Sequence, residues 1–265
     1  MKKVTVFAVF LACVWGIFCM FQASGVAAAE ETQVRPGPSV QDAGQENKSH
    51  SNGHVVCLDP GHQSYTVDMS ALEPNGPGSS EMKVLATSGT QGTYTGIPEY
   101  ALNLDVSLLL RDILEDRGYT VIMTRTDNET AISNMERALM AGNEGAEIFI
   151  RIHANGDASH QSSGALALCP SGYNPYVASL SAESERLSHC ILDTYCGATG
   201  FNNLGVQYND TMTGINWSTV PVTILEMGFM THEYDDNRMA DTQFRQVMAE
   251  GIADGIDIYF GIGQQ

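Results

Sequence analysis

Four residues of this chain have the side-chain types of a hydrolytic metal centre: His62, Glu99, His153 and Glu226. Neutral imidazoles and carboxylates bind zinc, and a catalytic zinc ion keeps three protein ligands and one open position. His62, Glu99 and His153 would fill the three positions. Glu226 would then be the base that takes a proton from water and returns it to the leaving group. Because the metal also polarises the scissile carbonyl, such a site needs no serine or cysteine nucleophile.

Three of these residues follow apolar runs of strand length: His62 after residues 55–58 and a turn, His153 after 148–152, and Glu226 after 220–225. Open α/β sheets carry their chemistry at the carboxyl ends of the strands, so the three are predicted to share one sheet edge. Glu99 opens a helix predicted over residues 99–117, where the helix dipole favours a carboxylate.

Each residue also has a purely structural interpretation. A histidine after a strand is commonly a hydrogen-bonded turn residue, a glutamate in a first helical turn is a usual helix charge, and Glu226 could be an exposed loop acid. Spacing alone leaves these alternatives open, because no short motif such as H-E-x-x-H is present. The coincidence of three suitable strand ends favours the metal site.

The remaining elements alternate between strands and helices along the chain. Strands are predicted at 119–125, 147–152 and 164–169, and helices at 133–143, 180–195 and 241–259. Ser133 and Glu136 have the spacing of a capping box, and Gly118 that of a helix C-cap. The pattern predicts a single α/β domain with a mostly parallel, twisted sheet covered by helices on both faces.

The irregular stretch 63–98 separates His62 from Glu99 and is rich in Gly, Pro, Ser and Thr. A structureless loop of this length is unusual in a compact domain and indicates a functional segment or added short strands. We expect it to line the rim of a substrate groove.

The first 29 residues have the features of a secretory signal peptide. Lys2 and Lys3 precede a long apolar run, which ends in the small residues 27–29. The alternative is an uncleaved membrane anchor. Residues 30–52 are predicted to be a flexible linker, and residues 53–263 the catalytic domain. The chain is therefore expected outside the cytoplasm, secreted or at the cell wall.

The net charge of −18 argues against some partners. A protein with this much negative charge should repel nucleic acid and anionic membranes. We therefore expect no nucleic-acid binding and no stable membrane contact after signal cleavage, and we expect a monomer. Cys190 and Cys196 could pair in an exported protein, although their spacing on one helix makes this difficult.

Several stretches together resemble one known family. They are Leu58-Asp59-Pro60-Gly61-His62, Glu99 at the head of a helix, Ile152-His153-Ala154-Asn155 and Leu225-Glu226-Met227-Gly228-Phe229, with Gly118-Tyr119-Thr120-Val121, Thr124-Arg125 and Glu136-Arg137-Ala138 between them. This set is similar to the zinc-dependent N-acetylmuramoyl-L-alanine amidases of bacterial cell walls, the amidase type 3 family. The resemblance covers about residues 55–262.

The resemblance implies one Zn²⁺ per chain held by His62, Glu99 and His153, with Glu226 as the catalytic residue. It also implies peptidoglycan as the substrate, cut between N-acetylmuramic acid and L-alanine. Three features depart from the family pattern: the stretch 63–98 is longer, Arg151 stands where a small hydroxyl residue is common, and the segment around Gln207 lacks the basic residue that many members carry there. By strand alternation we expect the Arg151 side chain to point away from His153.

Two other functions remain possible on the residues alone. A zinc carboxypeptidase or another amide hydrolase could use the same ligand types, but carboxypeptidase-type sites have His and Glu ligands close in sequence, unlike His62 and Glu99. A non-catalytic cell-wall binding protein of the same fold would be expected to lack Glu226, which is present.

Overall fold

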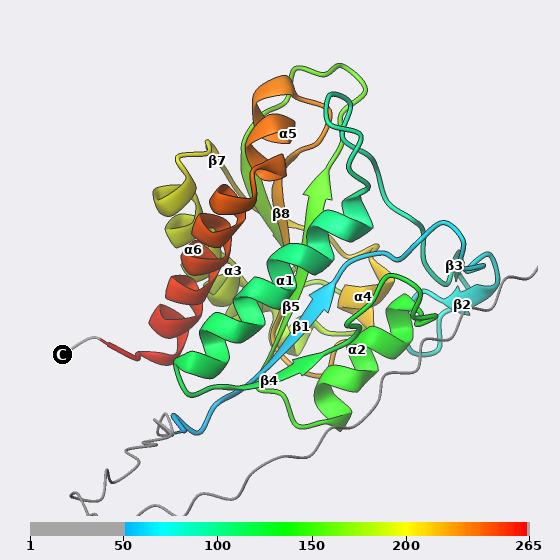
Figure 1. The fold of residues 1–265 in the computed structure, drawn as a ribbon. Helices are drawn as coiled ribbons and strands as arrows, with labels where there is room; N and C mark the ends of the chain where they lie inside the picture. The colour runs from blue at the N-terminus through cyan, green and yellow to red at the C-terminus, as the bar shows by residue number, and fades with distance from the viewer. Residues whose placement is uncertain (1–50, 264–265) are drawn as a thin grey trace, which may run out of the picture. The chain divides into compact units, whose positions relative to one another are not determined.

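A computed structural model describes residues 51–263 of the chain (Figure 1). Its strands are β1 Val55–Pro60, β2 Leu72–Pro74, β3 Met82–Val84, β4 Thr120–Met123, β5 Ile148–Asn155, β6 Ala165–Cys169, β7 Asn203–Tyr208 and β8 Val222–Phe229. Its helices are α1 Glu99–Asp116, α2 Asn134–Asn143, α3 Ser181–Thr199, α4 Thr213–Asn216, α5 Glu233–Ala240 and α6 Thr242–Phe260, with a short 3₁₀ turn at Ala178–Leu180. The predicted signal peptide and nearly all of the predicted linker lie outside the described residues.

The central sheet has six strands in the order β4-β1-β5-β8-β6-β7. Strands β4, β1, β5 and β8 are parallel, and β6 pairs antiparallel to β8. The predicted mostly parallel sheet is therefore confirmed. From β1 the chain moves to the edge strand β4, whereas from β5 it moves towards β8 and β6. The carboxyl ends of β1 and β5 thus form a topological switch point, the place where open α/β sheets bind ligands.

Helices cover both faces of this sheet, as predicted (Figure 1). On one face α1, α3 and α6 bury the larger apolar core, and on the other α2 and α4 bury a smaller one. Helix α1 illustrates how the spacing produces this packing. Its fully buried residues Leu102, Val106, Leu110 and Leu114 recur every fourth position and form one stripe. Burying each such side chain stabilises the fold by about 1.5–3 kcal/mol.

The predicted capping box of α2 and the predicted glycine after α1 agree with the structure, whereas α3 continues to Thr199, four residues past its predicted end. Ser133 caps α2 in a complete capping box: its hydroxyl accepts from the Glu136 amide, and the Glu136 carboxylate accepts from the Ser133 amide. Gly118 follows α1 with a φ of 88°, the left-handed conformation expected after a helix. The cysteines Cys57, Cys169, Cys190 and Cys196 are all free, so the possible Cys190–Cys196 disulfide is not formed.

Three short elements had no sequence prediction: β7, α4 and α5. Strand β7 is exposed or half-buried along its length, and α5 is rich in acidic residues. Neither therefore has the apolar period from which longer elements are recognised.

The stretch 63–98 contains two short strands, as its length suggested. β2 and β3 pair as an antiparallel hairpin, which Figure 1 shows at the side of the domain next to α4 and α2. The hairpin is held to both helical segments: the Trp217 indole N–H donates to the Pro74 carbonyl at 2.8 Å, and the Met135 amide donates to the Glu73 carboxylate at 3.1 Å. It is therefore an anchored part of the domain.

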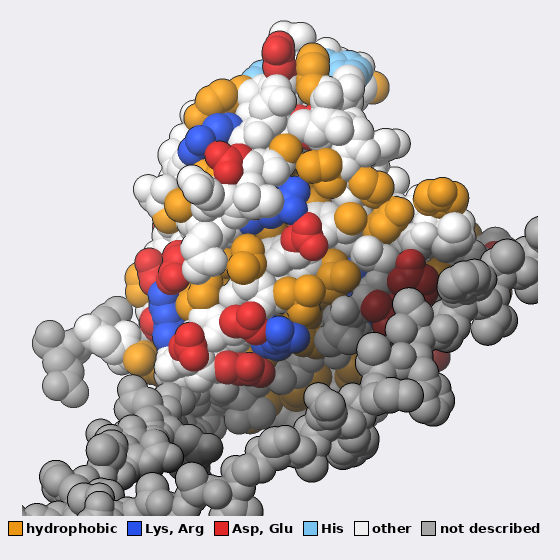
Figure 2. All heavy atoms as spheres, in the orientation of Figure 1, with side chains coloured by type: hydrophobic (Ala, Val, Ile, Leu, Met, Phe, Trp, Pro, Cys, Tyr) orange, Lys and Arg blue, Asp and Glu red, His pale blue; other side chains and the backbone are white. Residues whose placement is uncertain are grey.

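Figure 2 shows acidic side chains spread over one face of the domain with a few basic ones among them, in keeping with the charge of −18. Among residues 51–263, no helix has both the length and the apolar character that crossing a membrane requires.

Candidate metal centre

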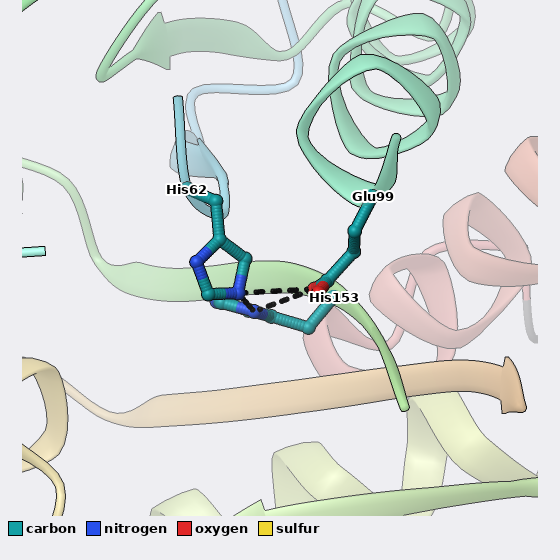
Figure 3. Close-up of side chains that lie close together, drawn as sticks. All are labelled: His62, Glu99 and His153. Carbon is teal, nitrogen blue, oxygen red and sulfur yellow. Dashed lines mark hydrogen bonds and ion pairs between the residues drawn. The ribbon is translucent and has the colours of Figure 1, made fainter. Parts of the chain in front are cut away.

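His62, Glu99 and His153 converge on one point at the switch point of the sheet (Figure 3). The Nε2 atom of His62 lies 3.1 Å from Oε1 of Glu99, Nδ1 of His153 lies 3.3 Å from the same oxygen, and the two nitrogens are 3.1 Å apart. The three donor atoms thus form a nearly equilateral triangle. Bonds of about 2.0–2.2 Å to a tetrahedral zinc ion place its ligand atoms about 3.3–3.6 Å apart, so the triangle is close in size to one face of such a site.

The tautomer of His62 also suits a ligand. Its Nδ1 lies 2.9 Å from the backbone carbonyl of Thr87, which can only accept a hydrogen bond. Nδ1 must therefore carry the proton, and Nε2 presents its lone pair to the centre of the triangle. A carbonyl that fixes the imidazole in this way is the usual partner behind a metal-bound histidine. Thr87 belongs to the long 63–98 stretch, so that stretch orients a site residue.

Glu99 is the first residue of α1, and its side chain is buried. Its Oε1 accepts from the Ala154 amide and the Asn103 side chain, each at 3.2 Å, and its Oε2 accepts from the Thr90 amide at 2.8 Å. Burial would raise the pKa of Glu99, but the close polar contacts of its carboxylate with the His153 and His62 rings hold that pKa well below its usual value. The carboxylate is therefore ionised and fixed in orientation.

Sequence reasoning missed Asn103. Its amide also donates to the Gly61 carbonyl at 3.2 Å, so it links Glu99 to the turn that carries His62. The available signal was a polar residue four positions after Glu99, on the face that α1 buries.

His153 is packed closely against the β1 turn. A Cβ atom at Gly61 would overlap the His153 ring, so the glycine of the Asp-Pro-Gly-His motif gives the imidazole its space. Burial lowers the pKa of His153 to about 4, which keeps the ring neutral at pH 7, as a metal ligand requires. Its Nε2 is buried and has no hydrogen-bond partner among the described residues.

Glu226 lies beside the triangle and outside it. It is in register with His153 on the neighbouring parallel strand, about 4.8 Å away in backbone spacing and on the same face. Burial raises the pKa of Glu226 to about 8, the charge of Glu99 acts in the same direction, and that of Arg151 opposes both. A second carboxylate thus faces the metal-site residues without being one of the three convergent ligands.

The strands carrying His153 and Glu226 are longer than predicted. We expected each residue to follow its strand, but β5 continues to Asn155 and β8 to Phe229. The reason is mutual pairing, because the two strands stay hydrogen-bonded past the site, with a register shift between His153 and Asn155. His153 and Glu226 are therefore held by the sheet itself, whereas His62 lies in the turn after β1.

The expectation that Arg151 points away from His153 is wrong. Residues two positions apart on a strand point to the same face, so alternation in fact places Arg151 beside His153. In the structure the Arg151 charge contributes to the lowered pKa of His153 and opposes the raised pKa of Glu226. Its Nε donates to Oδ2 of Asp59 at 2.7 Å.

Two buried arginines hold the turn that carries His62. Arg137 donates to the carbonyls of Pro60 and His62 at 2.8 and 3.1 Å, and Arg125 donates to those of Pro60 and Gly61 at 2.8 and 3.0 Å. His62 itself has a φ of 63°, a left-handed conformation that costs about 1–3 kcal/mol in a residue other than glycine. The clamped carbonyls offset that strain and keep the ring pointing at the site.

We expect Arg137→Met to lower the free energy of unfolding by about 3–5 kcal/mol, the usual cost of breaking a buried ion pair. Arg137 and Asp59 are both fully buried, and Nη1 lies 2.7 Å from Oδ1. Urea unfolding measures the change, and Arg186→Met, which removes an exposed pair with Glu183, is the control and should change little. Equal losses in the two variants would show that the buried cluster has no special role.

Comparison with known proteins adds a family match. Residues 56–257 match a family described as N-acetylmuramoyl-L-alanine amidase. Uncharacterized protein YqiI of Bacillus subtilis (strain 168) is 28% identical over 173 residues, covering 65% of this chain and 79% of that protein.

N-acetylmuramoyl-L-alanine amidase LytC of the same organism is 25% identical over 208 residues, covering 78% of this chain but 36% of LytC. The crystal structure of the N-acetylmuramyl-L-alanine amidase Ami1 from Mycobacterium smegmatis superposes with a TM-score of 0.72 at 26% identity, covering 80% of this chain and 99% of that one.

Proposed function

The chain belongs to the N-acetylmuramoyl-L-alanine amidase family, and from this membership we propose that it is an exported, zinc-dependent enzyme acting through His62, Glu99, His153 and Glu226. The family consists of hydrolases that cut peptidoglycan between N-acetylmuramic acid and L-alanine, and the chain is a hydrolase of that class. The zinc ion, the roles of the four residues and export are the parts that we propose.

The observation that carries the proposal is the triangle of donor atoms. Two imidazole nitrogens and one carboxylate oxygen lie 3.1–3.3 Å apart, with the tautomer of His62 set by the Thr87 carbonyl. His62, Glu99 and His153 would hold the ion, which when bound acts as a Lewis acid towards water and the scissile carbonyl.

Glu226 supplies the proton transfers. In its ionised form, Glu226 accepts a proton from the attacking water, whose oxygen joins the lactyl carbonyl carbon as the C–N bond breaks. The resulting carboxylic acid gives that proton to the departing alanine nitrogen. The products are a lactyl carboxylate on the glycan and a peptide with a free N-terminal L-alanine. The pairing of β5 with β8, in which Glu226 is opposite His153, holds the two residues side by side.

Export rests on the sequence of the first 52 residues. A cleaved signal over 1–29 and a flexible linker over 30–52 would deliver the catalytic domain 53–263 to the cell wall, where its substrate lies. The charge of −18 supports action as a soluble monomer rather than on an anionic membrane surface.

The decisive experiment incubates the purified protein with peptidoglycan and labels the newly exposed amino groups. We expect N-terminal L-alanine to appear, to stop on metal chelation and to return when Zn²⁺ is added back. Release of a C-terminal amino acid instead would identify a carboxypeptidase. Binding to the wall without any new amino group would identify a non-catalytic wall protein.

A further inference from the structure

The segment 87–90 contacts two of the three residues that converge on the metal centre. The Thr87 carbonyl lies 2.9 Å from Nδ1 of His62, and the Thr87 hydroxyl lies 3.1 Å from the same nitrogen. Three residues later, the Thr90 amide donates to Oε2 of Glu99 at 2.8 Å, and the Thr90 carbonyl accepts from the Glu99 amide at 3.0 Å. One short piece of chain thus holds His62 and Glu99 through the side-chain atoms that the donor triangle does not use.

Gly89 lies within this segment and is packed against both side chains. A Cβ atom at this position would overlap Oε2 of Glu99 and would lie 2.8 Å from Cδ2 of His62. Gly89 also has a φ of 76°, in the left-handed region that favours glycine. The absence of a side chain at residue 89 therefore lets the backbone lie close enough to contact both residues.

The segment 87–90 is anchored on both sides. Before it, the Leu85 carbonyl accepts from the backbone amide of Asn134 at 2.8 Å and from its side chain at 2.9 Å. After it, the buried Asp236 carboxylate accepts from the amides of Tyr94 and Thr95 at 2.8 and 2.9 Å. Asn134 belongs to α2 and Asp236 to α5, and neither helix carries one of the four site residues. The position of the segment is therefore fixed by parts of the fold outside the metal centre.

Side chains bind a metal ion more tightly when their orientation is fixed before the ion arrives, because less rotational freedom is lost on binding. We propose that the segment 87–90 is a positioning element that holds His62 and Glu99 as a pair in the orientation that binds zinc, and that Gly89 is the residue on which this depends. The inference rests on the proposed zinc site and extends it to residues outside the ligand set.

Two glycines of the same stretch provide a matched test. Gly78 and Gly89 both have a φ of 76°, but a Cβ atom at Gly78 would meet no atom of the described residues within 4 Å. The backbone strain of an alanine is therefore the same at both positions. Only Gly89→Ala adds a contact with Glu99 and His62. The carboxylate is the end of a flexible side chain, so it would move to admit the methyl group and would leave its place in the donor triangle.

The dissociation constant for Zn²⁺ is measured on the purified protein by competition with a chromophoric chelator. We expect Gly89→Ala to bind Zn²⁺ about 10–100-fold more weakly than the unchanged protein, the usual loss when a group that orients a ligand is disturbed. Gly78→Ala should bind Zn²⁺ with unchanged affinity. The shared backbone strain should lower the Tm of the metal-free protein by about 2–8 °C in both variants.

The visible absorption of bound Co²⁺ adds a readout of ligand geometry, which a loss of stability alone would not change. We expect the spectrum of Gly89→Ala to differ from that of the unchanged protein, and the spectrum of Gly78→Ala to match it.

Thr87→Val and Thr87→Ser test the same segment without replacing a glycine. Valine keeps the branched shape but removes the hydroxyl next to Nδ1 of His62, so Zn²⁺ affinity should fall by about three- to tenfold, as for one neutral hydrogen bond. Serine keeps a hydroxyl and should restore the affinity. Because Thr87 is exposed, this pair decides the question if Gly89→Ala fails to fold.

The outcomes separate this inference from the proposed function. Equal Zn²⁺ affinities in Gly89→Ala and Gly78→Ala overturn the positioning role and leave the zinc-dependent amidase standing. Where Gly89→Ala does not fold, equal affinities in Thr87→Val and Thr87→Ser do the same. Failure of the unchanged protein to bind Zn²⁺ overturns the proposed zinc site, and this inference with it.

Discussion

Replacing Glu226 with Gln is expected to lower kcat by at least the ~10²–10⁴-fold that general acid–base catalysis provides. The amide keeps the size and shape of the side chain but cannot accept the proton of the attacking water. Since Glu226 lies beside the donor triangle and outside it, bound zinc should stay near one equivalent. Release of L-alanine-terminated peptides and zinc content, measured on the same preparation, give the two quantities.

The control for this variant is Glu233→Gln, which changes an exposed carboxylate on α5. It should leave both quantities unchanged. If Glu226→Gln kept full zinc and near-normal turnover, Glu226 would be a structural carboxylate and another group would have to move the proton. If it instead lost its zinc, Glu226 would have to be counted among the groups that hold the metal.

The His153→Ala variant is expected to lose most of its bound zinc and nearly all of its activity. Its Nδ1 is one corner of the donor triangle. Without it only two of the three protein ligands remain, which is fewer than a catalytic zinc site requires. Loss of affinity should exceed the ~10–100-fold typical for removal of a group that only supports a ligand. Metal analysis after dialysis against a fixed zinc concentration measures this directly.

His189→Ala is a matched control, because His189 lies on the exposed side of α3. His62→Ala, at another corner of the triangle, should repeat the result for His153→Ala. Far-UV circular dichroism shows whether the variants remain folded, which matters because the His153 ring also packs against Gly61. A His153→Ala protein with a full equivalent of zinc and normal turnover would remove His153 from the ligand set.

The sequence by itself determined the parts of this protein that depend on neighbouring residues. The four-residue period of α1, the capping box at Ser133 and Glu136, and the apolar runs before His62, His153 and Glu226 are all local patterns. From them followed the α/β class, the mostly parallel sheet and the expectation that the site residues share one edge. The residue types then indicated the chemistry.

Only the tertiary structure decided features that depend on residues far apart in the chain. The 3.1–3.3 Å triangle and the tautomer of His62 require Thr87 and His153 to arrive from different segments. The extension of β5 and β8 past the site comes from their mutual pairing, which neither strand's composition reveals. Hydrogen bonds and close packing between such segments act through space, and sequence spacing carries no measure of those distances.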